Sequence, residues 1–198
     1  MDANRSTGKD INILQLGMSV EIKYTNDKLL HTRYRELRRD INDKYYHVHV
    51  SLKDDWDESS YVCVATKENQ VVGGCRLTIF DKHLLPMETK DFRISREHKI
   101  GEIAELSKLV VHPQFSKDNI ANQLFMETEK MAINIGINYI YSIATSKQAR
   151  LYSLYYKRYK HQTTGKSHFE ILDGIQIPYS VKNKYQREVS SLIRVKIG

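Results

Sequence analysis

The sequence predicts a single mixed α/β domain over residues 1–198, with helices on both faces of a central mixed sheet. The chain has 198 residues, the size of one domain, and 40% of them are hydrophobic, which is enough for a substantial core. Apolar residues at helical spacing alternate along the chain with short β-rich runs. The second half follows the order strand, loop, helix, strand, helix, which indicates local parallel pairing inside the sheet.

The first half of the chain is expected to hold a short strand, a helix and a hairpin. Residues 11–16 are weakly patterned and form the candidate strand. An apolar stripe at helical spacing predicts a helix over residues 30–41. Residues 42–60 are polar and indicate a loop. The β-rich runs 61–66 and 71–80 are separated by a polar four-residue turn, which is the pattern of a β-hairpin.

A strand and a helix follow a long connection. The strand covers residues 103–111 and ends at a His-Pro pair, and the helix covers residues 119–135. Asp118 or Asn119 is expected to cap this helix, and Gly136 is expected to end it.

The last part of the chain continues the alternation. Residues 137–144 are a candidate strand, and residues 147–160 are a candidate helix that carries several tyrosines and basic side chains. The runs 170–172 and 175–179 flank an Asp-Gly pair, so we expect them to close the sheet as a hairpin.

Charge is unevenly distributed. The formal net charge is +7, and residues 147–198 hold 11 of the 31 basic side chains but only 3 of the 24 acidic ones. A second basic cluster contains Arg33, Arg35, Arg38 and Arg39. Such asymmetry indicates an acidic protein or a nucleic acid as partner, or else a solvated basic face without one. The sequence has no helix-turn-helix, zinc-finger or RNP pattern, so nucleic acid is not favoured.

Several classes of protein are not favoured either. No apolar run approaches the roughly 18 residues that a membrane-spanning helix needs, and the first residues lack the apolar core of a signal peptide. We therefore expect a cytoplasmic protein. Cys63 and Cys75 lie in apolar, strand-like runs and are expected to be reduced core thiols. Two cysteines without a histidine pair at ligand spacing do not predict a metal site.

The segment Gly101–Phe115 is the most informative, because its β-rich run ends in Val-His-Pro. It resembles the central strand of the GNAT acyltransferase superfamily, where Val-x-Pro leads into a glycine-containing loop that binds the pyrophosphate of coenzyme A. The resemblance implies a GNAT-type acyltransferase fold. Here the loop reads Ser-Lys-Asp-Asn-Ile-Ala, and only Ala121 fits the pattern Arg/Gln-x-x-Gly-x-Gly/Ala. Asp118 would repel a pyrophosphate, so acetyl-CoA is not favoured as donor.

Four further motifs resemble a branch of that superfamily that lacks this loop: the acyl-homoserine-lactone synthases and the N-acyl amino acid synthases of the FeeM type. They are Arg33 on the first helix, the loop Asp54-Asp-Trp-Asp57, the strand Gly74-Cys-Arg76-Leu and the strand Glu105-Leu-Ser-Lys108. The branch implies a donor chain carried on the phosphopantetheine of acyl carrier protein. Lys108 replaces an Arg of the lactone synthases, and Lys and Arg are not equivalent at a bidentate site. With the different surroundings of Trp56, this favours an amino acid synthase.

The reaction implied by the resemblance is attack of an α-amine on a thioester. The amine is mostly protonated near neutral pH, so a base is needed. Glu105 lies in an apolar strand and is the candidate base. The alternative is a structural Glu105 that pairs with Arg76 or Lys108.

The reaction also needs a hydrogen-bond donor for the thioester oxygen and a proton donor for the leaving thiolate. The backbone N–H groups of Leu109, Val110 and Val111 are candidates to donate to its oxygen. Tyr156 is the candidate that protonates the leaving thiolate, and Tyr152 is the rival. The alternative for each tyrosine on this helix, including Tyr155 and Tyr159, is packing in the core.

The candidate substrate-binding residues are Arg33, Arg76, Ser107, Lys108, Asp54 and Asp57. Arg33 and Arg76 are candidates to hold the carboxylate of the acceptor, because a guanidinium binds a carboxylate in a bidentate manner. Alternatively, they pair with the two aspartates and fix the loop over the site. The fatty acyl chain requires an apolar tunnel, which ordinary core residues would also line.

The partner surface follows from the charge distribution. Because acyl carrier protein is acidic, its candidate docking residues are Arg150, Lys157 and Arg158, helped by Arg35, Arg38 and Arg39. We therefore expect an N-acyltransferase that moves a medium or long acyl chain from acyl carrier protein to the α-amine of an amino acid, with tyrosine implied by the resemblance. We expect no bound cofactor, with the acyl-phosphopantetheine as co-substrate. The alternatives are a lactone synthase that uses S-adenosylmethionine, an acetyl-CoA-dependent N-acetyltransferase, and a basic binding module without catalysis.

Overall fold

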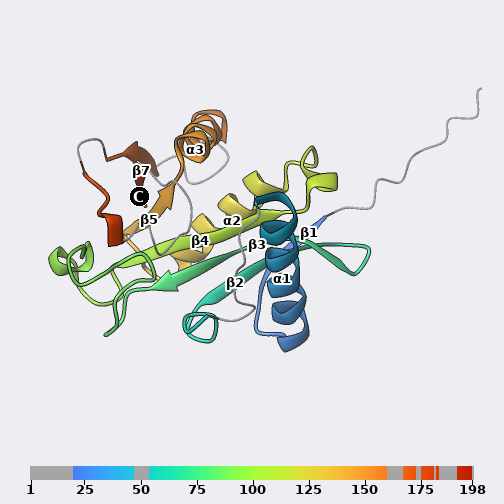
Figure 1. The fold of residues 1–198 in the computed structure, drawn as a ribbon, viewed down its shortest axis with the longest axis horizontal. Coiled ribbons are helices and arrows are strands. Elements are labelled where there is room, and N and C mark those ends of the chain that lie inside the picture. Colours follow the sequence, from blue (N-terminus) through green and yellow to red (C-terminus); the bar gives the residue numbers. More distant parts are fainter. Residues whose placement is uncertain are drawn as a thin grey trace, which may run out of the picture.

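The computed structural model describes residues 20–46, 54–159, 167–172, 175–180, 182 and 191–197, and a seven-stranded mixed sheet runs through it (Figure 1). The strands lie in the order β1-β2-β3-β4-β5-β7-β6. They are β1 (Glu21–Thr25), β2 (Tyr61–Lys67), β3 (Gln70–Ile79), β4 (Ile103–Val111), β5 (Tyr139–Ala144), β6 (His168–Ile171) and β7 (Ser191–Lys196). Neighbouring strands are antiparallel except β4 and β5, which are parallel.

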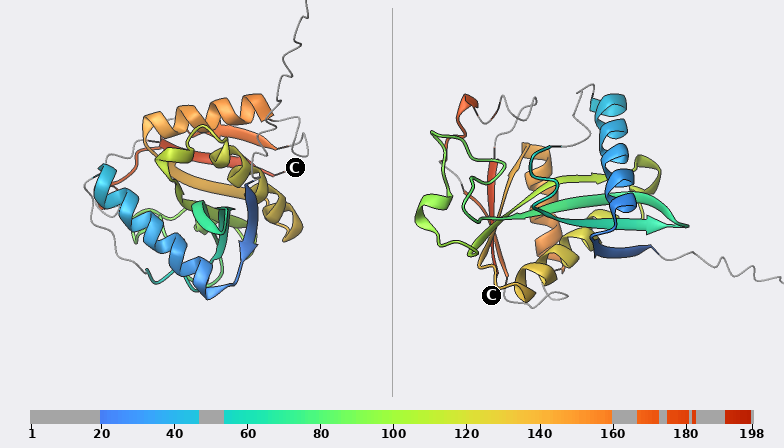
Figure 2. Two further views of the ribbon diagram at one scale, coloured as in Figure 1. Left: turned by 90° about the vertical axis from the view of Figure 1, so that its right-hand side faces the viewer. Right: turned by 90° about the horizontal axis from the view of Figure 1, so that it is seen from below.

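Three α-helices cover the sheet. They are α1 (Lys28–Ile41), α2 (Ile120–Asn134) and α3 (Ser146–Tyr159); α1 continues into a π-helical segment, Asn42–Tyr46, and short 3₁₀ turns lie at Ser95–Glu97 and Pro113–Phe115. Helix α1 packs on one face of the sheet, and α2 and α3 pack on the other (Figure 2). The predicted mixed sheet with helices on both faces is therefore confirmed.

Helix α1 has a clear local cause. The side chain of Asp27 accepts hydrogen bonds from the backbone N–H groups of Leu29 (2.7 Å) and Leu30 (3.4 Å), so it caps the helix. Tyr34, Arg38 and Ile41 form the buried face. The Tyr34 ring and the Arg38 guanidinium therefore extend from α1 towards β3 and β4.

The start of α2 differs from the prediction. Asn119 occupies the cap position, but its backbone is left-handed (φ 59°) and its side chain caps no helix N–H. The carboxylate of Asp118 instead pairs with the Lys67 ammonium at 3.0 Å, so the predicted side-chain cap is wrong. Gly136 has φ 78° just beyond the helix, as expected of a residue that ends one.

The hairpin and the central strand match the prediction closely. Glu68 and Asn69 form a two-residue turn with φ of 53° and 63°, the positive values that a type I′ hairpin turn needs. Cys63 and Cys75 face each other across this hairpin as free, buried thiols, as predicted. Strand β4 has the predicted bounds.

The two ends of the sheet depart from the prediction. Strand β1 was not expected, and the expected strand over residues 11–16 lies outside the described residues. The expected hairpin of 170–172 with 175–179 is wrong, because β6 pairs with β7, and residues 175–178 are not in a strand. Pro178 interrupts that run and cannot donate to a ladder. Leu192, Ile193 and Val195 fill the central position between β5 and β6 instead.

The long connection between β3 and β4 is a structured cover rather than a loose loop. Leu85 and Met87 are buried against Ile103, Tyr141 and Leu192 on the sheet face that α1 leaves open. The buried Glu88 carboxylate ties this segment together by accepting hydrogen bonds from the backbone of Leu85 (2.8 Å) and Ser95 (2.6 Å). Among the described residues, no helix is long and apolar enough to cross a bilayer.

Candidate active site

The sheet opens between β4 and β5. Their parallel pairing covers only Ile103–Glu105 with Tyr139–Tyr141, although β4 continues to Val111 and β5 to Ala144. Beyond the last pair, the two strands share no register partner. Backbone groups that leave a ladder need another hydrogen-bond partner, so such an opening is suited to a ligand that lies between the strands.

A β-bulge in β4 lies beside this opening. Gly74 pairs with Val110 but Arg76 pairs with Ser107, so β4 contains one extra residue in this interval. Lys108 has φ 57°, which is unusual for a residue with a side chain. The bulge redirects the backbone at Leu109, where the segment predicted to donate to the thioester oxygen begins.

A buried ion-pair network lies on the α1 side of β3 and β4. The Arg76 guanidinium is completely buried and donates to the carboxylates of Asp54 and, at 3.0 Å, of Asp57. Arg38 donates to both Asp57 oxygens at 3.3 and 3.4 Å. Burial would raise the pKa of Asp57, but Arg38, a backbone hydrogen bond and Arg76 hold it below its usual range. Arg76 therefore pairs with the two aspartates and fixes their loop, which was the alternative to binding the acceptor carboxylate.

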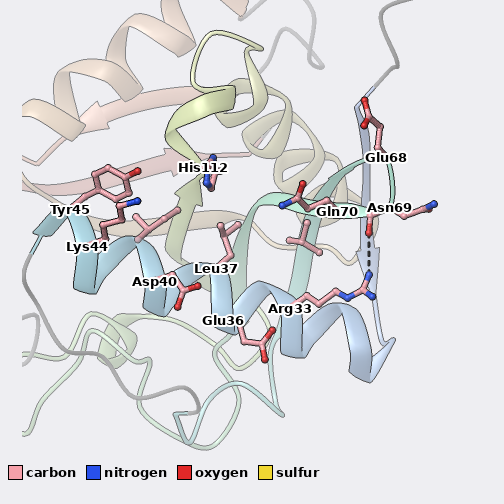
Figure 3. A pocket seen from close by; sticks show the side chains of 12 residues that line it. Arg33, Glu36, Leu37, Asp40, Lys44, Tyr45, Glu68, Asn69, Gln70 and His112 are labelled. Carbon is pink, nitrogen blue, oxygen red and sulfur yellow. Dashed lines mark hydrogen bonds between the residues drawn. The ribbon is translucent and has the colours of Figure 1, made fainter.

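Arg38 takes the place that the sequence suggested for Arg33. Arg38 is only 3% exposed, so its expected role in a docking surface is wrong. Arg33 is exposed and donates to the Asn69 carbonyl at 3.1 Å. Figure 3 shows Arg33 on an open groove between α1 and the β2–β3 turn, where Glu36 and Asp40 also lie. The structure does not bring Arg33 together with Arg76.

Lys108 and Ser107 complete the network. The Lys108 ammonium lies 3.7 Å from Asp54, and its side chain is 35% exposed. Burial lowers its pKa, Asp54 opposes this, and the positive charges of Arg38 and Arg76 add to the lowering. Ser107 Oγ and two guanidinium nitrogens of Arg76 have no hydrogen-bond partner within the described part of the chain. Buried donors without a partner are uncommon in folded proteins.

Glu105 is 1% exposed and anchors the cover segment, which is the connection between β3 and β4 (residues 80–102). Its carboxylate accepts a 2.6 Å hydrogen bond from the Met87 backbone N–H. Ala104 and Leu106 pack in the core under α2, and successive side chains alternate, so Glu105 faces the opposite side of the sheet. Its register partner on β5 is Tyr141, the last paired residue before the opening.

Tyr156 lies in the core on the other face. Its ring stacks on Phe169 (5.1 Å between centroids) and meets Tyr155 edge to face (4.9 Å). Burial raises the pKa of Tyr156, and the nearby Glu129 adds to this. Tyr152 and Tyr155 both pack on Phe125, and the side chain of Tyr159 lies outside the described structure. The structure therefore does not bring Tyr156 together with Glu105.

The outer face of α3 carries the predicted docking residues. Arg150, Lys157 and Arg158 are exposed. Leu151 (56% exposed) and Leu154 (62% exposed) lie between them. The sequence prediction did not include these leucines, although their helical spacing from Arg150 and Arg158 was available as a signal.

Comparison with known proteins gives a family and a fold. The model of the family described as N-acyl amino acid synthase FeeM matches residues 27–166. No curated protein sequence matches the chain. The solved structure of FeeM, an N-acyl amino acid synthase from uncultured soil microbes, is 15% identical with a TM-score of 0.61, covering 90% of both chains.

Two other solved structures represent the wider fold. The acyl-homoserine-lactone synthase LasI is 13% identical with a TM-score of 0.60, covering 92% of each chain. A GNAT-family acetyltransferase from Staphylococcus aureus Mu50 is 11% identical with a TM-score of 0.58, covering 91% of this chain and 100% of that one. These likenesses confirm the GNAT fold.

Proposed function

Since the chain belongs to the family of N-acyl amino acid synthases of the FeeM type, we propose that its acyl donor is a medium- or long-chain acyl group on acyl carrier protein. The proposed co-substrate is thus an acyl-phosphopantetheine, and no other cofactor is needed. The proposed acceptor is the α-amine of an amino acid, with tyrosine as the first to test. The site of transfer is the opening between β4 and β5.

The loop between β4 and α2 is the observation that carries the donor proposal. Asp118 puts a negative charge next to Asn119, the position at which coenzyme A-dependent relatives of the fold have the first glycine of the pyrophosphate loop. The carboxylate is held there by Lys67 at 3.0 Å, and the Lys67 ammonium lies over the Phe115 ring (5.2 Å). Lys67 offsets part of the Asp118 charge, and the repulsion that remains is larger for a pyrophosphate than for the single phosphodiester of a carrier protein.

The outer face of α3 supports a carrier protein as the partner. Arg150, Lys157 and Arg158 offer positive charge to an acidic protein, and Leu151 and Leu154 offer exposed apolar surface between the charges. An interface with an apolar centre and a charged rim is typical of protein partners.

The acceptor's groups have candidate partners near the opening. Lys108 is the accessible cation of the network, so we propose that it holds the acceptor carboxylate. Arg76 is fully buried and acts by orienting Asp54. We propose that Glu105 takes the proton of the amine, because its carboxylate belongs to the last β4–β5 pair before the opening.

The function is tested by offering the same acyl chain on acyl carrier protein and on coenzyme A, with each amino acid in turn. Mass spectrometry identifies the product, and released thiol gives the rate. We expect an N-acyl amino acid, a higher kcat/KM with the carrier protein, and tyrosine among the best acceptors. A lactone formed from S-adenosylmethionine, or equal efficiency with acyl-CoA, would refute the proposal.

The docking face is tested by reversing Arg150, Lys157 and Arg158 to Glu together. Exposed contacts are worth about 0.2–1 kcal/mol each, so KM for acyl carrier protein should rise about 3- to 150-fold. A short pantetheine thioester should be used equally well by both proteins. The matched control reverses Lys23, Lys82 and Lys130, which are exposed on other elements. If both substrates suffer equally, α3 supports the active site; if neither suffers, it is only a solvated face.

A further inference from the structure

Tyr34 connects helix α1 to the bulge in β4. Its side chain is buried, and its hydroxyl donates to the Lys108 carbonyl at 2.7 Å. The ring lies directly over Gly74 of β3, where an added Cβ would be 2.6 Å from Tyr34 Cδ2. Gly74 therefore provides the space that lets the ring lie flat and reach across β3 to β4.

The conformation that Tyr34 contacts is a strained one. Lys108 has φ 57°, and the left-handed region costs a residue with a side chain about 1–2 kcal/mol. The bulge persists only if surrounding contacts favour it. The hydrogen bond from Tyr34 is such a contact, and burial raises the pKa of Tyr34, so the phenol remains a donor throughout the usual assay range.

Peptide planarity relates this hydrogen bond to the opening. The chain has no cis peptide bond among its described residues, so the Lys108 C=O and the Leu109 N–H belong to one planar trans unit and point in opposite directions. The carbonyl points towards Tyr34 on the α1 side. The Leu109 N–H must therefore point away from α1, at a position beyond the last β4–β5 pair.

We propose that Tyr34 is a positioning residue for acyl transfer, which holds the Lys108 peptide so that the Leu109 N–H donates to the thioester oxygen as it gains charge. This inference rests on the proposed function, because it concerns the same opening. Tyr34 itself does not touch the substrate. Arg38, one helical turn further along α1, fixes the neighbouring loop through Asp57, so α1 holds both the bulge and this loop.

The test is Tyr34→Phe, which removes one oxygen and keeps the ring. Misplacing a donor by a fraction of an ångström weakens it mainly in the transition state, so kcat should fall about 10- to 100-fold while KM for the acyl donor stays within about twofold. Tyr24→Phe, on β1, is the matched control and should keep kcat.

A folded Tyr34→Phe protein with unchanged kcat, or with a raised KM alone, would overturn the inference. A wild-type protein that transfers no acyl group from either donor would instead refute the proposed function. The geometry is then tested without turnover by NMR, through the Leu109 amide resonance. We expect this resonance to shift in Tyr34→Phe and to stay in place in Tyr24→Phe, and an unshifted resonance in both would count against the bulge role.

Discussion

Glu105→Gln separates two roles of this carboxylate: accepting a hydrogen bond from the Met87 N–H, and the proposed removal of a proton from the acceptor amine. Glutamine still offers an oxygen to the Met87 N–H, which lies 2.6 Å from the carboxylate, but it cannot take a proton from an amine. A hydrogen bond to a charged group is worth about 1.5–3 kcal/mol and a neutral one about 1, so the variant should lose about 0.5–2 kcal/mol of stability. Each kcal/mol corresponds to about 2–4 °C in Tm for a chain of this size. Loss of a general base should lower kcat by about 10²–10⁴.

Glu88→Gln is the matched control. Glu88 is equally buried, lies in the same cover segment and accepts hydrogen bonds from Leu85 and Ser95. Each of its two carboxylate oxygens accepts from a backbone N–H, which an amide nitrogen cannot do, so Glu88→Gln should lose more stability than Glu105→Gln and still keep its kcat. Released thiol measures the rate at saturating acceptor, and thermal melting measures stability.

The pH dependence sharpens the comparison. Above the pKa of the free amine, the attacking nitrogen is already neutral and only the proton that it releases after attack has to be taken up, so the deficit of Glu105→Gln should shrink as the pH rises towards that value. If Glu105→Gln keeps its kcat within about threefold and behaves like Glu88→Gln, the reasoning fails. Glu105 would then be only an anchor for the cover segment.

Two further predictions concern stability. Asp57→Asn leaves two buried guanidinium groups under-compensated and should cost about 3–5 kcal/mol near neutral pH. Because the folded state lowers the pKa of Asp57, this contribution is present above the ordinary aspartate pKa and is lost as the pH falls below it, which urea unfolding from pH 7 to 3 would measure. The effect of Glu129 on stability has the opposite pH dependence. Burial raises the pKa of Glu129, with Ser167 opposing, so the folded state is destabilised as the pH rises above the ordinary glutamate pKa. Glu129→Gln should therefore raise Tm near pH 8 and leave it unchanged near pH 4, and an equal Tm difference at both pH values would contradict this.

Local patterns predicted most of the secondary structure. The stripe on α1, the hairpin turn and β4 depend on neighbouring residues, so spacing alone finds them. The meeting of Asp54 with Arg76 follows from motifs that were recognised in order along the chain. Asp54 and Arg76 come close together in space because the chain adopts the fold that those motifs indicated.

The motif suggested Arg33 for the place that Arg38 occupies, which shows a limit of predicting a site from motif order alone. The two residues are five positions apart on one helix, which turns them about 140° from each other. Arg38 is one turn from Tyr34 and shares its buried face, so helical phase favours Arg38 where the motif suggested Arg33. The hydroxyl contact of Tyr34 could not be predicted in this way, because spacing identifies a buried ring but not the carbonyl it reaches.

Non-local contacts account for the other differences. The Met87 N–H reaches Glu105 through a connection whose sequence has no periodic pattern, so the anchoring role of Glu105 was not visible. The pairing of β6 with β7 also joins segments far apart in the sequence, whereas the Asp-Gly pair after β6 favoured a local hairpin.

The position of β7 has a consequence for how the protein is made. This strand is the last described in the chain, yet it lies between β5 and β6 and hydrogen-bonds to both. A nascent chain can assemble β1 to β4 while it is still on the ribosome, but β5 and β6 have no common neighbour until Ser191–Lys196 have been synthesised. At about 5–20 residues per second, the interval after β6 lasts one to a few seconds. During it, two strands expose open edges that other chains can pair with. Stalled translation within residues 172–190 is therefore expected to yield aggregates rather than a shortened, folded protein.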